Sequence, residues 1–240
     1  MKKIVFLMVM AFGFLTLQAQ ESSTPHVAIG DVLYKVGGIT KYIRPDRLDA
    51  TTAGQAYAVV FYVSRDEANK WSGWAVNLDE MESCQMAGSD VESHDDFTFG
   101  NDLLSAVDAA LKNNDGSTNT ANALNAIYHS SFEIDEFVPY NYIQTLGNSW
   151  YLPALGQLHF LYAQIPEVNY ALTKLKIYVP DVKMISIPDV LGENPLYWSS
   201  TSGSSGIEVW QLTADGGSKQ NALSFTGRVR AIINFELVNE

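Results

Sequence analysis

The sequence predicts an α+β fold, because its strand-like and helix-like segments fall into three consecutive blocks. Strand-like segments fill the residues up to about position 80, apolar residues at helical spacing dominate the middle, and the last forty residues read as a β-meander. Strands at both ends with helices between them favour an α+β domain in which the two ends of the chain share one sheet.

The N-terminus has the layout of a secretory signal peptide. Lys2 and Lys3 form a basic end, Ile4–Leu17 is an almost unbroken apolar run, and Leu17-Gln18-Ala19-Gln20 offers a cleavage site, so residues 1–20 are predicted to be removed. The alternative is an uncleaved anchor, although the run is short for a membrane span. No cysteine follows it, so the lipobox of a lipoprotein is missing. We expect an exported chain without a later membrane span, located in the periplasm, at the cell surface or outside the cell.

Composition supports a folded core and argues against polyanionic partners. Hydrophobic residues make up 47% and aromatic residues 12% of the 240 positions, enough for one large domain or two small ones. The formal net charge is −12, and loss of Lys2 and Lys3 with the leader makes it two units more negative. Such a field repels nucleic acid and anionic lipid, so we expect neither as a partner.

Cys84 is the single cysteine, so the exported chain has no internal disulfide and no thiolate set for a zinc site. A catalytic thiol would need a histidine, and the chain offers His26, His94, His129 and His159. No familiar nucleophile motif surrounds Cys84, so a buried or incidental thiol is the favoured interpretation. We expect no cofactor.

Residues 21–80 are predicted to form a β-rich N-terminal extension. Two short strand-like runs within Val27 to Thr40 flank a Gly-Gly pair at positions 37 and 38, which is a hairpin signal. Ala56 to Val63 is a strong buried-strand run, and Trp74 to Leu78 is its expected partner.

An acidic stretch from Cys84 to Gly100 precedes the helical block. Its side chains are metal ligands by type, but consecutive acids point in different directions and no ligand spacing recurs, so a solvated loop is favoured and no metal site is predicted. The residues concerned are Asp90, Glu92, His94, Asp95 and Asp96.

Two helices are expected next. Asn101 can cap a helix that runs to Leu111, whose apolar residues fall on one face. After a tight turn, Thr118 or Thr120 is expected to cap a second helix that continues to Tyr128. The residues from 132 to 146 are expected to be irregular and aromatic.

The segment Trp150 to Tyr162 is the stretch around which we expect the chain to be organised. It reads as the end of an aromatic strand, then Pro153 at a first helical position, then a short apolar helix. The helix places one apolar stripe toward the core. Its members are Leu155, Leu158, Leu161 and Tyr162. Val168 to Lys176 is predicted to be helical again.

The C-terminal block is predicted to be a meander of strands. Tyr197 to Thr201 reads as a strand, and Ile207 to Thr213 and, in part, Arg228 to Leu237 alternate apolar and polar residues. Ala214 to Ser218 is a hairpin turn.

Three motifs together resemble one family. They are Trp150-Tyr151-Leu152-Pro153 with its helix, Tyr197-Trp198-Ser199-Ser200-Thr201, and Val229-Arg230-Ala231. Their order and spacing resemble the DUF1566 family, also called the Lcl C-terminal or Fibrobacter major-paralogous domain. The leader hairpin and the strands after it resemble the N-terminal part of exported proteins of Bacteroidetes. The resemblance therefore covers nearly the whole mature chain.

The resemblance implies a C-type lectin-like fold over residues 81–240, similar in outline to the formylglycine-generating enzymes, and one continuous domain over 26–238 is the alternative. It also implies a ligand site in the loops around the strand at 197–201. Arginines near that strand could instead form salt bridges, and its aromatic residues could support the core; both of these interpretations are favoured. The candidate ligand-binding residues are Trp198, Ser199, Ser200, Arg228 and Arg230.

This sequence departs from known relatives of that fold. Sugar-binding C-type lectins hold calcium with a Glu-Pro-Asn or Gln-Pro-Asp tripeptide and a Trp-Asn-Asp motif. Here Glu193-Asn194-Pro195 has another order and Trp198 is followed by two serines, so a calcium-dependent sugar site is not expected. One cysteine does not supply the thiols of a formylglycine-generating enzyme. Gln157 stands where many similar proteins carry Glu.

Three functions are consistent with these observations. The first is an exported, non-catalytic binding or adhesion-type module of a bacterial cell envelope, with a glycan or a surface protein as its ligand. The second is a structural or fimbrial accessory subunit. The third and least favoured is a hydrolase with a carboxylate pair, because no catalytic motif is present but acids can meet in the fold.

Overall fold

A computed structural model describes residues 26–68, 70–93, 97–187 and 195–237 of the chain. The signal peptide predicted for residues 1–20, the acidic cluster members His94, Asp95 and Asp96, and the start of the Glu193-Asn194-Pro195 tripeptide lie outside these residues.

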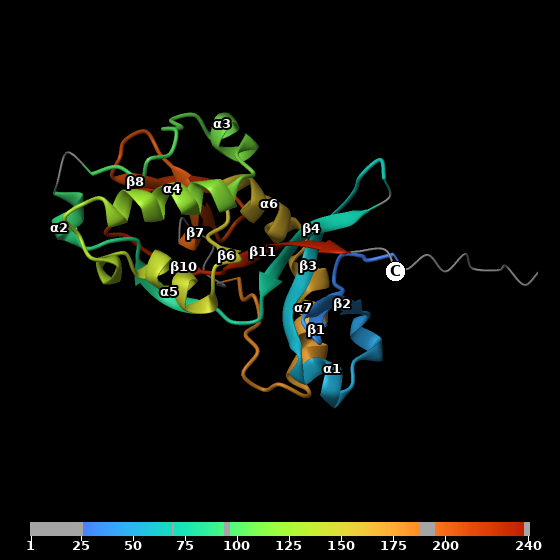
Figure 1. The fold of residues 1–240 in the computed structure, drawn as a ribbon. Coiled ribbons are helices and arrows are strands. Elements are labelled where there is room, and N and C mark those ends of the chain that lie inside the picture. The colour runs from blue at the N-terminus through green and yellow to red at the C-terminus, as the bar shows by residue number, and fades with distance from the viewer. Residues whose placement is uncertain (1–25, 69, 94–96, 188–194, 238–240) are drawn as a thin grey trace, which may run out of the picture.

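The described residues form an α+β structure with two sheets, as predicted (Figure 1). The strands are β1 Val32–Val36, β2 Ile39–Ile43, β3 Ala56–Arg65, β4 Trp71–Asn77, β5 Met81–Gln85, β6 Trp150–Tyr151, β7 Pro195–Ser202, β8 Glu208–Thr213, β9 Ser218–Ala222, β10 Thr226–Val229 and β11 Ile232–Leu237. The helices are α1 Ala50–Gly54, α2 Ser89–Glu92, α3 Val107–Lys112, α4 Gly116–Tyr128, α5 Val138–Leu146, α6 Leu155–Ala163 and α7 Ile165–Lys176, with short 3-10 turns at Pro45–Arg47 and Ile134–Glu136.

The six-stranded sheet has the order β2-β1-β3-β4-β11-β6, and each neighbouring pair in it is antiparallel. The last strand, β11, lies between β4 and β6, so both ends of the described chain share this sheet, as the sequence predicts. Segments 21–80 and 81–240 therefore contribute strands to one sheet, and the division between them stays a prediction.

The five-stranded sheet has the order β5-β10-β7-β8-β9, with β7 and β10 parallel and the other pairs antiparallel. Figure 1 shows it beside the six-stranded sheet, with α2, α3, α4 and α5 on its side of the molecule and α1 and α7 on the other.

Helix α6 lies between the two sheets, and its burial explains why the chain is organised around it. Leu158 and Leu161 pack with strand residues of the six-stranded sheet and with the apolar face of α7. Leu155 packs instead against Trp210 of β8. The predicted stripe is confirmed for these three leucines, while Tyr162 is only partly buried.

The two predicted hairpins are confirmed. Gly37 and Gly38 join β1 to β2 with φ of 59° and 83°, the left-handed values that a tight hairpin turn needs and that glycine adopts without steric cost. The turn between β8 and β9 likewise contains Gly216 with φ 82°.

Two predicted helix starts are wrong. Helix α3 begins at Val107 and not after Asn101, whose side-chain N–H groups donate to the backbone carbonyls of Asn119 and Ser200. Helix α4 begins at Gly116, and the Asp115 carboxylate caps it by accepting from the Thr118 N–H at 3.0 Å.

The region around Pro139 and Pro153 also differs from prediction. Residues 138–146 form helix α5, with Pro139 in its first turn, where proline costs no hydrogen bond. Pro153 lies before α6, whose N-cap is Ala154, and not at a first helical position. Residues 132–146 were expected to be irregular because they are rich in aromatic residues. In the structure, Tyr140 and Ile143 form the buried face of α5.

Candidate functional site

The predicted ligand residues on β7 are buried. The Trp198 indole N–H donates to the Cys84 carbonyl at 2.9 Å, and the Ser199 hydroxyl donates to the Trp210 carbonyl at 2.6 Å. The Ser200 hydroxyl accepts from Asn119 at 3.3 Å. Trp198 and Ser199 have no exposed surface and Ser200 is 2% exposed. These side chains hold β7 to its neighbours, and their contact with a ligand stays a prediction that this placement does not support.

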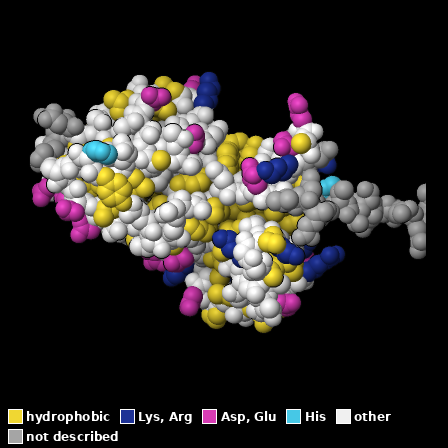
Figure 2. Space-filling view, viewed as in Figure 1, with side chains coloured by type: hydrophobic (Ala, Val, Ile, Leu, Met, Phe, Trp, Pro, Cys, Tyr) yellow, Lys and Arg dark blue, Asp and Glu magenta, His cyan; other side chains and the backbone are white. Residues whose placement is uncertain are grey.

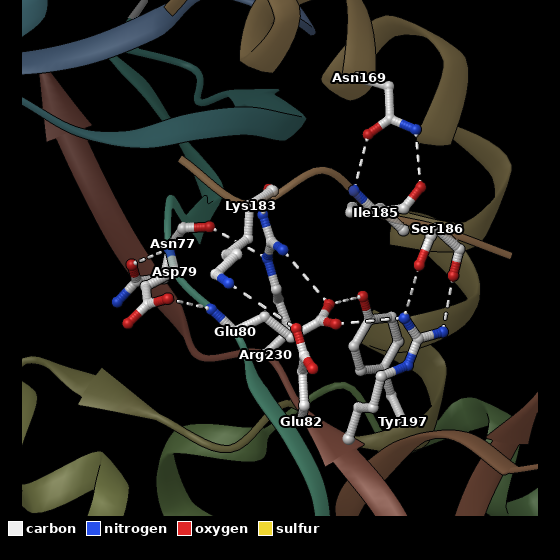
Figure 3. Close-up of polar contacts among 11 residues, drawn as sticks. Asn77, Asp79, Glu80, Glu82, Asn169, Lys183, Ile185, Ser186, Tyr197 and Arg230 are labelled. Atoms are coloured by element: carbon white, nitrogen blue, oxygen red, sulfur yellow. Dashed lines mark hydrogen bonds and ion pairs between the residues drawn. The ribbon is translucent and has the colours of Figure 1, made fainter. Parts of the chain in front are cut away.

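Arg228 and Arg230 converge on one buried carboxylate, Glu80, which follows β4 (Figure 3). Arg228 approaches one carboxylate oxygen at 3.1 Å and Arg230 approaches the other at 3.3 Å. The Tyr197 hydroxyl also donates to Glu80. The salt-bridge interpretation of the two arginines is therefore confirmed.

The two arginines also donate to three backbone carbonyls and to the Ser186 hydroxyl. Arg230 donates to Asn77 at 3.1 Å and to Lys183 at 2.7 Å, and Arg228 donates to Ser186 at 2.7 Å. The network therefore ties the chain after β4 and the segment after α7 to the five-stranded sheet. Because these arginine N–H groups bind acceptors within the protein, the network stabilises the fold.

A hollow of about 550 Å³ lies instead where α4, α5 and β6 meet near β11. Its lining residues include ones with hydroxyl, side-chain amide and apolar groups, and none of them has a charged side chain. They are Ser117, Thr120, Ala121, Leu124, Ile143, Gln144, Gly147, Asn148, Ser149, Trp150, Tyr151 and Asn234.

A second hollow of about 220 Å³ shares the loop from Gly147 to Trp150 with the first. It reaches Ile233 of β11 where the first reaches Asn234. Successive strand residues point to opposite faces, so the two hollows lie on opposite faces of the six-stranded sheet. The second also contains Lys35, whose ammonium lies 5.1 Å from the centre of the Tyr57 ring.

Local geometry fixes this shared loop. Helix α5 ends at Leu146, and its C-cap residue Gly147 has φ 102°, a positive value that favours glycine. The Trp150 N–H then donates to the Gly147 carbonyl at 3.1 Å, which turns the chain into β6. Asn148 and Ser149 are exposed at this turn.

A chain of hydrogen bonds supports the side of the first hollow nearest to α6. The Gln157 carbonyl oxygen accepts from the backbone N–H groups of Ala154 and Gly116 at 3.0 and 3.1 Å, and its amide donates to the Tyr151 hydroxyl at 3.3 Å. That hydroxyl donates to Asn234 at 2.5 Å. Gln157 is 1% exposed, and a glutamate in its place would lack the donor for Tyr151.

Cys84 has the environment of an inert thiol. It lies partly buried in β5, and burial raises the pKa of its thiol to about 11, so the nucleophilic thiolate is scarce at neutral pH. His159 lies near a serine, and its Nε2 is 2.7 Å from the Ser218 hydroxyl. The backbone N–H groups of the two residues before Ser218, Gly216 and Gly217, already donate to Thr213 and Asp215, so these two groups do not form an oxyanion hole for a Ser218 nucleophile.

The described residues give no support to the carboxylate-pair hypothesis or to a metal centre. Their two buried acids, Asp31 and Glu80, are each paired with arginine and not with one another. Within the same residues, no group of three or more histidines, cysteines or acids is placed to hold a metal ion.

Most of the first hollow cannot be predicted from the sequence. Trp150 and Tyr151 belong to an aromatic motif, but Asn148, Ser149 and Asn234 have the types of ordinary turn and strand residues. The available signal was the polar Gly-Asn-Ser run between an apolar segment and an aromatic pair. Its proximity to Asn234 depends on the pairing of β6 with β11, which no local pattern reveals.

No protein-family model matches the chain, and no curated protein matches its sequence. The resemblance to the DUF1566 family therefore stays a prediction. Among the helices of the described residues, none has the length and apolar character needed to cross a bilayer.

Proposed function

We propose that this chain is an exported, non-catalytic binding module whose ligand is an uncharged glycan, bound in the hollow beside the loop from Gly147 to Trp150. The single observation that carries the proposal is the chemistry of the lining. Hydroxyl and amide groups match the hydroxyl groups of a sugar as donors and acceptors, and the side chains of Ala121 and Leu124 match its C–H groups. A lining without charged side chains favours a ligand without charge.

The location differs from the one that the family resemblance implied. The side chains of Ser199, Ser200 and Arg230 have their polar groups engaged inside the protein, whereas Asn148, Ser149 and Gln144 are exposed at the rim of the hollow. Export by the N-terminal signal, membership of the DUF1566 family and a C-type lectin-like arrangement are parts of the same proposal.

A glycan array probed with the mature chain, residues 21–240, tests this function. We expect binding to uncharged glycans in the presence of EDTA. Ala121→Trp would fill the hollow and abolish binding, because Ala121 lines it and is exposed. Asn122→Trp is the matched control, since Asn122 is the next exposed residue of α4 and does not line the hollow.

Equal binding by the two tryptophan variants would place the ligand elsewhere. Absence of binding to every uncharged glycan would overturn the proposal in favour of the alternative of a structural or fimbrial accessory subunit.

A further inference from the structure

Three residues form a row across neighbouring strands of the six-stranded sheet. Tyr62 of β3 is paired with Trp74 of β4, and Trp74 is paired with Asn234 of β11. Directly paired residues project from the same face of a sheet, so these three side chains stand side by side. A bulge in β3 next to Tyr62 sets this register.

Phe160 of α6 completes an aromatic cluster on this row. The rings of Tyr62 and Trp74 are stacked with centres 4.2 Å apart, and Phe160 lies 5.1 Å from the first ring and 5.6 Å from the second. Phe160 is 42% exposed, and Tyr62 and Trp74 are partly exposed. Figure 2 shows hydrophobic side chains at the surface in the middle of the molecule, where α6 passes β4.

The aromatic cluster is continuous with the first hollow through Asn234. This exposed residue lines the hollow and is also the direct neighbour of Trp74 in the sheet. Ser149, which precedes β6, lines the same hollow on the far side of Asn234. The strip from Tyr62 to Ser149 crosses about three strand spacings, or roughly 15 Å.

The order of side chains along this strip matches the surface of a sugar chain. A pyranose ring has an apolar face of C–H groups and a rim of hydroxyl groups. The exposed surface of the aromatic cluster would bury such a face, while the amide of Asn234 and the hydroxyl of Ser149 would pair with the rim. Single exposed hydrophobic residues are ordinary, but three contacting rings beside a polar hollow are a surface suited to a ligand.

We propose that Tyr62, Trp74 and Phe160 form a second subsite that stacks a further ring of a glycan whose end lies in the hollow. This inference rests on the proposed function and adds that the ligand is an uncharged oligosaccharide, with affinity that depends on its length. The hollow binds one end of the sugar chain and the aromatic cluster binds the continuation.

Calorimetric titration with size series of uncharged oligosaccharides tests the subsite. The probes are glucose, mannose and galactose homo-oligomers, each from the monosaccharide to the hexasaccharide. We expect the affinity of the mature protein to rise about tenfold or more with length in at least one series. Phe160→Ala should remove most of that rise while leaving the affinity for the shortest bound sugar unchanged.

Phe225→Ala is the matched control, because Phe225 is also an exposed phenylalanine, 51% exposed, and lies outside the cluster. Trp74→Leu is the second test variant, and its fold is checked by circular dichroism, since Trp74 also packs against the core. Quenching of tryptophan fluorescence by the longer sugars provides an independent readout in the unmodified protein.

The outcomes separate the two claims. Binding that does not strengthen with length, or equal behaviour of Phe160→Ala and Phe225→Ala, would overturn the second subsite and leave the hollow intact. Failure of every series to bind would overturn both the subsite and the proposed function.

Discussion

Glu80 is the acid at the centre of the network around β10 and β11, where two arginines and one tyrosine contact its carboxylate. Its carboxylate is within 3.3 Å of Arg230 and 3.1 Å of Arg228, and Arg230 has no exposed surface. Desolvating such charges is costly, and removal of one partner leaves the others buried without compensation. Removing the charge of Glu80 should therefore lower the stability of the folded protein.

Glu80→Gln is therefore expected to lower the free energy of unfolding by about 3 to 5 kcal/mol. Urea unfolding monitored by circular dichroism measures the change. Glu236→Gln is the control, because the ion pair of Glu236 with Lys70 is exposed and exposed pairs contribute little. Equal losses in both variants would contradict the structural role of the network.

His159 predicts a pH dependence of stability. Burial lowers the pKa of its imidazole below the value of about 6.5 in an unfolded chain. The unfolded state then binds more protons than the folded state once the pH falls through about 6.5, so this contribution to stability is present above that pH and is lost below it.

The test is urea unfolding from pH 7.5 down to about 5, where His159→Gln should lose less stability than the unmodified protein. Glutamine keeps a polar group near the Ser218 hydroxyl, which His159 contacts at 2.7 Å. His129→Gln, at an exposed position, controls for removal of a histidine. An identical pH profile for His159→Gln and the unmodified protein would refute the assigned burial effect.

At the scale of elements, α6 depends on a close approach at Gly156. A methyl group added there would lie 2.5 Å from the Leu111 carbonyl oxygen and 2.7 Å from that of Asn113. The helix therefore packs directly against the backbone of the last turn of α3 and of the residue that follows it. Backbone atoms cannot move aside as a flexible side chain can, so the turn must shift to admit the methyl group.

Gly156→Ala is expected to destabilise the protein by about 1 to 3 kcal/mol through overpacking. Gly54→Ala, at the exposed end of α1 where an added methyl group meets nothing within 4 Å, should instead stabilise it by about 0.4 to 1 kcal/mol. Thermal unfolding of both variants gives the comparison. A stabilising Gly156→Ala would contradict the packing of α6 described above.

Elements with strong local patterns could be predicted from the sequence, and those set by distant contacts could not. The hairpin at Gly37 and Gly38 and the apolar α6 follow from turn chemistry and from helical spacing. Asn101 is of a capping residue type but lies several residues before the first residue of α3, where it donates to Asn119 and Ser200. The candidate site was missed for the same reason, because Ser149, Trp74 and Asn234 meet only through strand pairing.

At the scale of the whole molecule, the two sheets are coupled. Helix α6 packs on both, and the chain from β4 to β5 carries Glu80 into the network of the five-stranded sheet. Strand β11 brings the end of the chain back between β4 and β6. An arrangement with shared strands and a shared helix favours unfolding as one unit.

We therefore expect one cooperative unfolding transition for the mature chain. Its midpoint should be the same by circular dichroism, which reports helices of both sides, and by fluorescence of the tryptophans, which lie in both sheets. Two separated transitions would indicate that residues 21–80 and 81–240 fold independently.

A chemical-shift map tests most directly whether a glycan binds at the edge of the six-stranded sheet. Uncharged hexasaccharides of glucose, mannose and galactose are added in turn to the ¹⁵N-labelled mature protein. We predict that one of them shifts the side-chain amides of Asn148 and Asn234 and the indole N–H of Trp74. Shifts centred on Arg228 and Ser200, or no shift with any of the three sugars, would contradict the account.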